Sequence, residues 1–226
     1  MKIELIPVIE IEYEHQAIES PKKHPYWTNQ EVWHQYRRLS LKKAGFADEF
    51  APYLNGFPFY EPQKISDKNL EKLVVDHTKE FRDGVYKRYE QTSCFLGGYV
   101  LKINGEDKYF PQSCGDLSDI RYWEKLSKKE KASYEGIPAP NYTFWCNNVI
   151  FDFFVGKYKE HFKPTPPDIK LKVDLNELKI AVSKARNELK KLSERLIKIN
   201  QHMNLGIERI DDLLIWENPN HASAIS

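Results

Sequence analysis

The sequence is poor in cysteine, in long apolar runs and in net charge, and each shortage excludes a class of protein. Its three cysteines are an odd number, and Glu and Pro interrupt the opening "MKIELIPVIEIEYEH", which therefore lacks the apolar core of a signal peptide. We expect free thiols in a reducing cytoplasm rather than a fold held by disulfides. No run approaches the length needed to cross a bilayer, so we expect no membrane partner.

The near-balance of charge argues against a nucleic-acid partner. The chain has 34 Lys and Arg against 33 Asp and Glu, which gives a net charge of +1. Such a chain has no overall field that would draw it to nucleic acid. Residues 168–200 are mildly basic, but they carry five acidic residues beside nine basic ones, which is typical of a solvated helix face.

Motifs that would identify a metal protein or a nucleotide-binding enzyme are missing. No C-x-x-C pair occurs, and the seven histidines are scattered without ligand spacing, so we expect no metal. Gly97-Gly98 lacks the following helix and the Lys and Ser/Thr of a phosphate loop, and no nucleophile elbow is present. We therefore expect no cofactor.

What the sequence does contain indicates a folded protein with strands and helices. Residues 2–14 alternate apolar side chains with glutamates, which predicts a half-buried strand. A helix is predicted to begin at Thr28, in a capping box with Glu31, and to end before Gly45. Its apolar stripe comprises Val32, Tyr36 and Leu39. A second amphipathic helix is expected over residues 66–83, and the aromatic, proline-broken residues between the two helices predict an irregular packed loop.

A β-hairpin is the clearest local signal. Residues 104–105 are Asn-Gly, the dipeptide most typical of a two-residue turn. Such a turn pairs Val100 with Tyr109, and Lys102 with Asp107 as a cross-strand ion pair. The apolar run at 142–155 fits either a buried strand or a short core helix, because periodicity does not decide between them; we favour a helix over 148–162.

Nine apolar positions, separated alternately by three and four residues, predict a long helix over residues 173–204. These seam positions are Leu175, Leu178, Val182, Ala185, Leu189, Leu192, Leu196, Ile199 and Met203. We expect an α+β core domain over 1–163, a Pro-rich linker over 164–172, the long helix docked on the core, and a C-terminal tail over 205–226. Lysines flank the seam, so a parallel coiled-coil dimer is disfavoured, although the oligomeric state stays open.

These elements together predict an α+β fold, in which flanking helices cover an antiparallel sheet with a central hairpin. Within it, Cys114, Asp116 and Asp119 cluster beside a glycine-rich strand, and a thiol with two carboxylates could form a nucleophilic or acid–base site. Capping of a helix from about Asp116 to Lys131 explains both aspartates as well, and a structural thiol explains the cysteine. Candidate binding residues are Gly97, Gly98 and Trp123.

The segment "FLGGYVLKINGEDKYFPQSCGDLSDIRYW" resembles part of uncharacterised bacterial proteins of the toxin-immunity type. In those proteins a Gly-Gly strand, an Asn-Gly turn and a "PQ-x-C-G-D-L" turn lead to a Trp-bearing helix. The resemblance covers about 30 residues of the 226 and brings no functional residue with it. It implies a non-enzymatic protein that binds another protein and neutralises a toxin. The alternative is an enzyme with a site around Cys114, Asp116 and Asp119.

Overall fold

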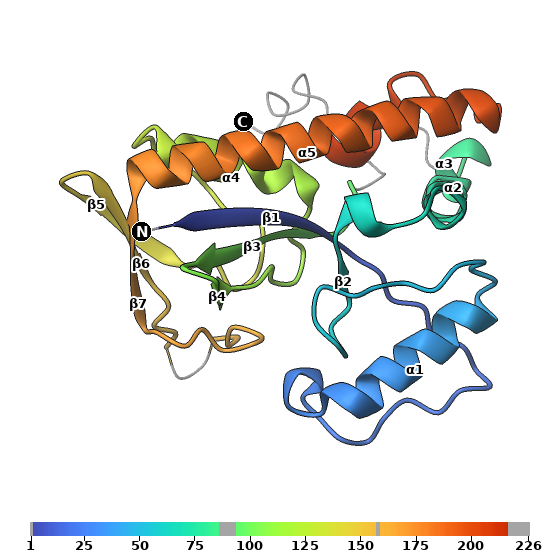
Figure 1. Ribbon diagram of the computed structural model, residues 1–226, viewed down its shortest axis with the longest axis horizontal. Coiled ribbons are helices and arrows are strands. Elements are labelled where there is room, and N and C mark those ends of the chain that lie inside the picture. Colours follow the sequence, from blue (N-terminus) through green and yellow to red (C-terminus); the bar gives the residue numbers. More distant parts are fainter. Residues whose placement is uncertain (1, 86–93, 157–158, 217–226) are drawn as a thin grey trace. The chain divides into compact units, whose positions relative to one another are not determined.

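The fold is α+β, as the sequence predicted. The computed structural model describes residues 2–85, 94–156 and 159–216 (Figure 1). It contains two antiparallel sheets, of four and three strands, in the orders β2-β1-β3-β4 and β5-β6-β7. In the described ranges no helix has both the length and the apolar character that crossing a bilayer requires.

The chain divides into two compact units. Unit 1 comprises Met1–Val8 and Leu96–Lys190, and unit 2 comprises Ile9–Phe95 and Lys191–Ser226. Strand β1 (Ile3–Glu10) and helix α5 (Leu175–His202) each give residues to both units. Each unit is therefore assembled from two separate stretches of sequence.

Unit 1 holds most of the strands. Besides the first part of β1 and of α5, its elements are β3 (Gly97–Ile103), β4 (Glu106–Tyr109), α4 (Ile120–Ser127), β5 (Asn141–Trp145), β6 (Asn148–Asp152) and β7 (Lys170–Asp174). Helix α4 and the first part of α5 lie on the same side of β1 and β3 (Figure 1), and an ion pair between Arg186 and Glu124 joins the two helices. The helix predicted to reach Lys131 ends earlier, at Ser127.

The hairpin of β3 and β4 confirms the predicted turn and ion pair. Lys102 Nζ lies 3.4 Å from the Asp107 carboxylate. Beyond the ion pair the predicted register is wrong, because a bulge between Leu101 and Lys102 places Leu101 rather than Val100 opposite Tyr109. A bulge inserts one residue into a strand and shifts the pairing by one position.

Residues 142–152 belong to β5, a turn and β6, and residues 153–156 and 159–162 are not helical, so the helix favoured for 148–162 is wrong; residues 157–158 lie outside the described ranges. β5 and β6 pair through a two-residue turn, and β6 pairs in turn with β7. Val149 and Phe151 are buried while their neighbours in β6 are not, which is the period-two burial of a sheet with one covered face. β7 also begins inside the expected linker of 164–172, and α5 begins only at Leu175.

Unit 2 holds most of the helices. Besides the last parts of β1 and α5, its elements are α1 (Gln30–Lys43), β2 (Phe59–Tyr60), α2 (Asp67–His77), α3 (Lys79–Arg82) and a π-helical turn (Asp212–Trp216). The predicted second helix corresponds to α2 and α3, and the Ser66 side chain caps α2 by accepting a hydrogen bond from the Asn69 N–H. β2 lies inside the stretch predicted to be an irregular loop.

The predicted start of α1 is wrong, and so are two of the three residues predicted for its buried face. Its N-cap is Asn29, because Thr28 belongs to a short 3-10 turn that precedes it. Val32 and Leu39, which the apolar stripe placed inside, are 43% and 48% exposed. Tyr36 is buried as predicted, and the buried face also contains Trp33, Arg37, Ser40 and Leu41. Because Trp33 and Tyr36 are buried, the charged Arg37 beside them also lies on the inward face of the helix.

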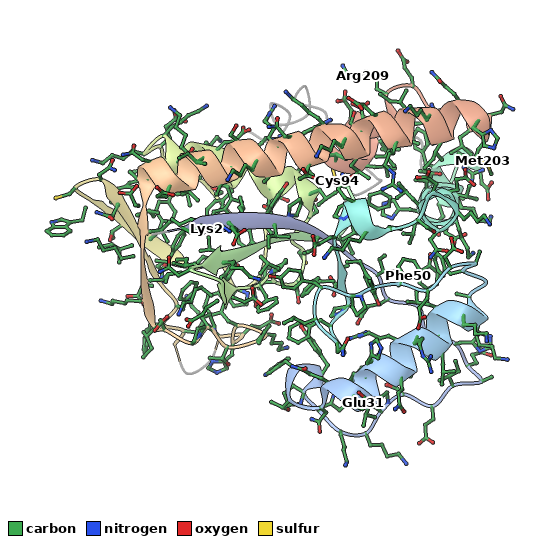
Figure 2. All side chains as sticks on the ribbon, viewed as in Figure 1. Lys2, Glu31, Phe50, Cys94, Met203 and Arg209 are labelled. Atoms are coloured by element: carbon green, nitrogen blue, oxygen red, sulfur yellow. The ribbon has the colours of Figure 1, made fainter. Side chains whose placement is uncertain are left out.

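The long helix buries eight of its nine predicted seam positions, and only Met203, which follows the last helical residue, is 40% exposed (Figure 2). In unit 2, Arg195 fixes the helix by hydrogen bonds to the Pro62 and Ile65 carbonyls and to the Asp67 carboxylate. The expected tail of 205–226 is packed in its first part. Phe95 N–H donates to the Leu214 carbonyl, and Ile210, Leu213 and Ile215 are buried.

Candidate functional sites

Three residues singled out by the sequence lie in the corner between β4 and α4 in unit 1. Asp116 is an N-cap, as predicted, because its Oδ1 accepts a 2.7 Å hydrogen bond from the Ser118 N–H. The Asp116 N–H donates in return to Asp119 Oδ2 at 3.2 Å. This reciprocal pair is a capping box, which satisfies N–H groups that a helix start leaves unpaired. Cys114 is exposed and has a positive φ of 66°, typical of a tight turn.

Asp119 is held in an unusual electrostatic state. It is 5% exposed, and burial raises its pKa to about 7, with a further increase from the Asp116 carboxylate. Burial also raises the pKa of the nearby Tyr134 phenol. A carboxyl group that titrates near neutral pH suits proton transfer, but a substrate must first reach it. Its oxygens accept main-chain hydrogen bonds inside the corner, so the geometry favours a structural role.

The raised pKa of Asp119 predicts a specific pH dependence of stability. An unfolded chain loses this proton near pH 3.8, whereas the folded chain keeps it to about pH 7. Between these values the folded state binds more protons, so the contribution of Asp119 to the free energy of unfolding falls as pH rises to about 7. Asn has no such proton. Urea unfolding measures this difference. As the pH is raised from 4 to 8, we expect the free energy of unfolding of Asp119→Asn to rise by about 1–4 kcal/mol relative to that of wild type.

The matched control for this prediction is Glu130→Gln, which removes an exposed carboxyl group of the same unit. Its unfolding free energy should follow the wild-type pH profile. Parallel profiles for Asp119→Asn and wild type would contradict the assignment of a raised pKa to Asp119.

The candidate binding residues lie inside unit 1 rather than on its surface. Gly97 and Gly98 are buried with φ of 130° and 124°, and the Gly97 N–H donates to the Gly115 carbonyl at 2.9 Å. A Cβ on Gly98 would lie 3.5 Å from the Asp116 carbonyl oxygen. The glycine pair thus lets the main chain of the corner approach. Trp123 is 1% exposed and belongs to the core.

An open edge of the second sheet is a feature that the sequence did not identify. Next to a two-residue turn the closing pair, Trp145 and Asn148, exchanges main-chain hydrogen bonds, and such pairs alternate along the hairpin. The main-chain groups of Tyr142 and Phe144 therefore point away from β6. Within the described ranges no other strand pairs with β5 on that side. Trp145 is 61% exposed, with Lys172 Nζ 5.5 Å from its ring centre.

β5 lacks the devices that usually protect an edge strand. Its sequence, NYTFW, contains no charged residue and no proline, and its pairing with β6 runs without a bulge. The opposite edge of the same sheet, β7, carries Lys170 and Lys172. β4, at the edge of the other sheet, carries three charged residues and faces a bulge. Only protected edges resist pairing with a further strand, so β5 is an available template.

Unit 2 contains a cavity of about 340 Å³ beside α1. Helix α1 forms one wall, and the segment from Phe46 to Tyr60 forms the other; Phe50, labelled in Figure 2, belongs to this segment. Arg37 lines the cavity although its side chain is only 7% exposed. A buried arginine beside a cavity is uncommon enough to require an explanation.

Comparison with known proteins does not assign a function to these sites. No protein-family model matches the chain, and searches of curated proteins and of solved structures gave no significant match. In the part of the chain that the structure describes, no group of three or more His, Cys, Asp or Glu side chains could hold a metal ion.

The sequence therefore located the corner but missed both surface features. Cys114, Asp116 and Asp119 do lie in one turn, and capping accounts for the two carboxylates. The open edge of β5 follows from the strand order. The sequence did not predict that order, because the run at 142–155 fitted either a strand or a helix. For the cavity, the available signal was the aromatic, proline-broken segment between the first two predicted helices, for which the sequence predicted only an irregular packed loop.

Proposed function

We propose that this chain is a non-enzymatic protein that binds another protein through the edge of β5. The observation that carries the proposal is the contrast between the two edges of one sheet. β7 carries lysines, whereas β5 is uncharged, has no bulge and, within the described ranges, pairs with no strand on its outer side. A partner would add an extended segment to this edge, and the outward main-chain groups of Tyr142 and Phe144 would supply hydrogen bonds.

Trp145 would anchor such a partner. Its side chain stands on the open face of the sheet, the same face as Thr143 and Lys172, and most of it is accessible. Tryptophan is among the residues that contribute most to protein interfaces, because it buries a large rigid surface at little cost in conformational entropy. Main-chain pairing would thus give affinity, and the tryptophan would fix the register of the partner strand.

The resemblance of residues 95–123 to immunity-type proteins suggests that the partner is a bacterial toxin, and the cysteine content suggests a cytoplasmic location. The capping roles of Asp116 and Asp119 support a non-enzymatic assignment over the alternative of an enzyme built on these residues with Cys114. The resembling segment would then be a structural corner, and binding would lie on the neighbouring sheet.

Affinity capture from the source cells with substituted proteins tests this proposal. We expect Trp145→Ser and Thr143→Lys each to reduce recovery of a specific partner at least tenfold, because the first removes the anchor and the second places a lysine on the edge. Both positions are exposed, so both variants should keep the wild-type melting temperature. Growth of cells that express the captured partner, with and without this chain, then tests whether the partner is a toxin.

The control is Phe154→Ser, which removes an apolar side chain that is 71% exposed in the same unit but lies outside the strand. It should retain the partner. If all three variants recover the same partner at the wild-type level, the edge of β5 is not the binding surface.

A further inference from the structure

The cavity of unit 2 contains an arginine that is fixed before any ligand arrives. The Arg37 Nε–H donates to the Gly56 carbonyl at 3.2 Å, and its Nη1 donates to Glu12 Oε1 at 2.6 Å. Its guanidinium carbon lies 5.1 Å from the Trp33 ring centre and 5.5 Å from that of Tyr26. Cation–π contacts and two hydrogen bonds thus hold the planar group in one orientation.

Most of the hydrogen-bonding capacity of Arg37 is unused. A guanidinium group has five N–H donors, and the contacts to Gly56 and Glu12 occupy two of them. In the described part of the chain the remaining donors, including both on Nη2, have no acceptor. Buried polar groups normally find partners, and Arg37 lines the cavity. These donors are therefore suited to an acceptor that enters the cavity.

The charges around the cavity leave no excess of negative charge that would repel a monoanion. Arg37, Arg38 and Lys42 are positive and Asp48 and Glu49 are negative, so the charged lining side chains sum to one positive charge. Glu12 pairs with Arg37 from outside the lining. Burial raises the pKa of Glu10, which also faces Arg37, to about 7, so Glu10 opposes an anion less than an ordinary carboxylate would.

The rest of the lining is largely aromatic. Phe46, Phe50, Phe57 and Tyr60 contribute rings, and Phe50 packs edge-on against both Phe46 and Tyr60 at centre distances of 5.0 and 5.1 Å. Burial raises the pKa of Tyr60 to about 12, so its phenol stays neutral. Rings in edge-to-face arrangement form walls that accept another flat ring. The volume of about 340 Å³ lies at the lower end of small-molecule sites.

We propose that this cavity binds a small aromatic monocarboxylate, with the carboxylate on the free N–H donors of Arg37 and the ring between the aromatic side chains of the Phe46–Tyr60 segment. A planar carboxylate matches the geometry of a guanidinium group and can accept hydrogen bonds from two of its N–H donors. The site lies in unit 2, whereas the proposed protein-binding edge lies in unit 1, so this proposal goes beyond the proposed function and does not depend on it.

Isothermal titration with indole-3-acetate and with its neutral isostere indole-3-acetamide tests the proposal. We expect wild-type protein to bind the acetate at least tenfold more tightly than the amide, because only the acetate pairs its charge with Arg37. Arg37→Gln should remove this preference. Comparable affinities for the two compounds in wild type, or no binding of either at millimolar concentration, would overturn the proposal.

Arg37 is packed between two rings, so Arg37→Gln could fail to fold, and a second pair of variants keeps the test decisive. Leu39 lines the cavity and is 48% exposed, whereas Val32 is 43% exposed on the same helix and does not line it. Leu39→Glu should weaken indole-3-acetate binding at least tenfold by placing a negative charge at the cavity. Val32→Glu should change it less than twofold. Equal effects of the two substitutions would show that the probe binds elsewhere.

Discussion

Leu189→Asp is expected to destabilise the protein by at least about 4 kcal/mol, a large part of the stability of an ordinary domain. Leu189 is completely buried at the centre of the α5 seam. The substitution removes a large apolar side chain from the core and leaves a carboxylate in its place without a designed partner. Burial of the seam within a single chain also means that the loss should not require dissociation of an oligomer.

Urea unfolding combined with sedimentation measures this effect. Asn187→Asp is the matched control, because it adds a carboxylate at an exposed position two residues earlier on the same helix; it should stay within about 0.5 kcal/mol of wild type. A wild-type dimer, together with a Leu189→Asp monomer that keeps the wild-type melting temperature, would show instead that the seam serves assembly.

Gly56→Ala should be nearly as damaging, at about 3–5 kcal/mol, for two reasons that add. Gly56 has a φ of +78°, which disfavours any residue with a Cβ, and the added Cβ would lie 2.4 Å from the Gln30 carbonyl oxygen. That oxygen belongs to the main chain at the start of α1, so it cannot move aside as a flexible side chain would. The Gly56 carbonyl also accepts the hydrogen bond from Arg37, which displacement would disturb.

Gly84→Ala separates the two causes, because Gly84 has a φ of +72° but no atom within 4 Å of the added Cβ. It should cost only about 1 kcal/mol, the penalty of the backbone conformation alone. The difference between the two melting temperatures then measures the close approach to Gln30. Equal losses would mean that the segment around Gly56 relaxes away from α1.

Features fixed by local sequence were predictable, and features fixed by distant contacts were not. The Asn104-Gly105 turn, the Asp116 cap and the seam of α5 each depend on residues a few positions apart, and all three are present. The buried face of α1 depends on what packs against it. Because the large Trp33 ring is buried together with Tyr36, Val32 and Leu39 face outward and Arg37 faces inward.

The candidate sites follow the same division. The corner of Cys114, Asp116 and Asp119 is contiguous in sequence and was found, whereas the cavity joins α1 to a segment that begins after the helix ends. The choice between strand and helix for 142–155 was also non-local, because its alternating burial depends on the covered face of a sheet that includes β7. Because the sequence did not decide between a strand and a helix for these residues, it could not predict the open edge of β5.

The division of β1 and α5 between the two units has a consequence for synthesis on the ribosome. Unit 1 needs its residues up to Lys190, and unit 2 needs residues from Lys191 onward to pack against α2 and Phe95. Neither unit can therefore complete its core until α5 has left the exit tunnel, although residues 9–95 are made early. Contacts between residues so far apart in the sequence form late, which slows folding and leaves apolar surface exposed until they form. Nascent chains arrested before residue 175 should accordingly depend on chaperones.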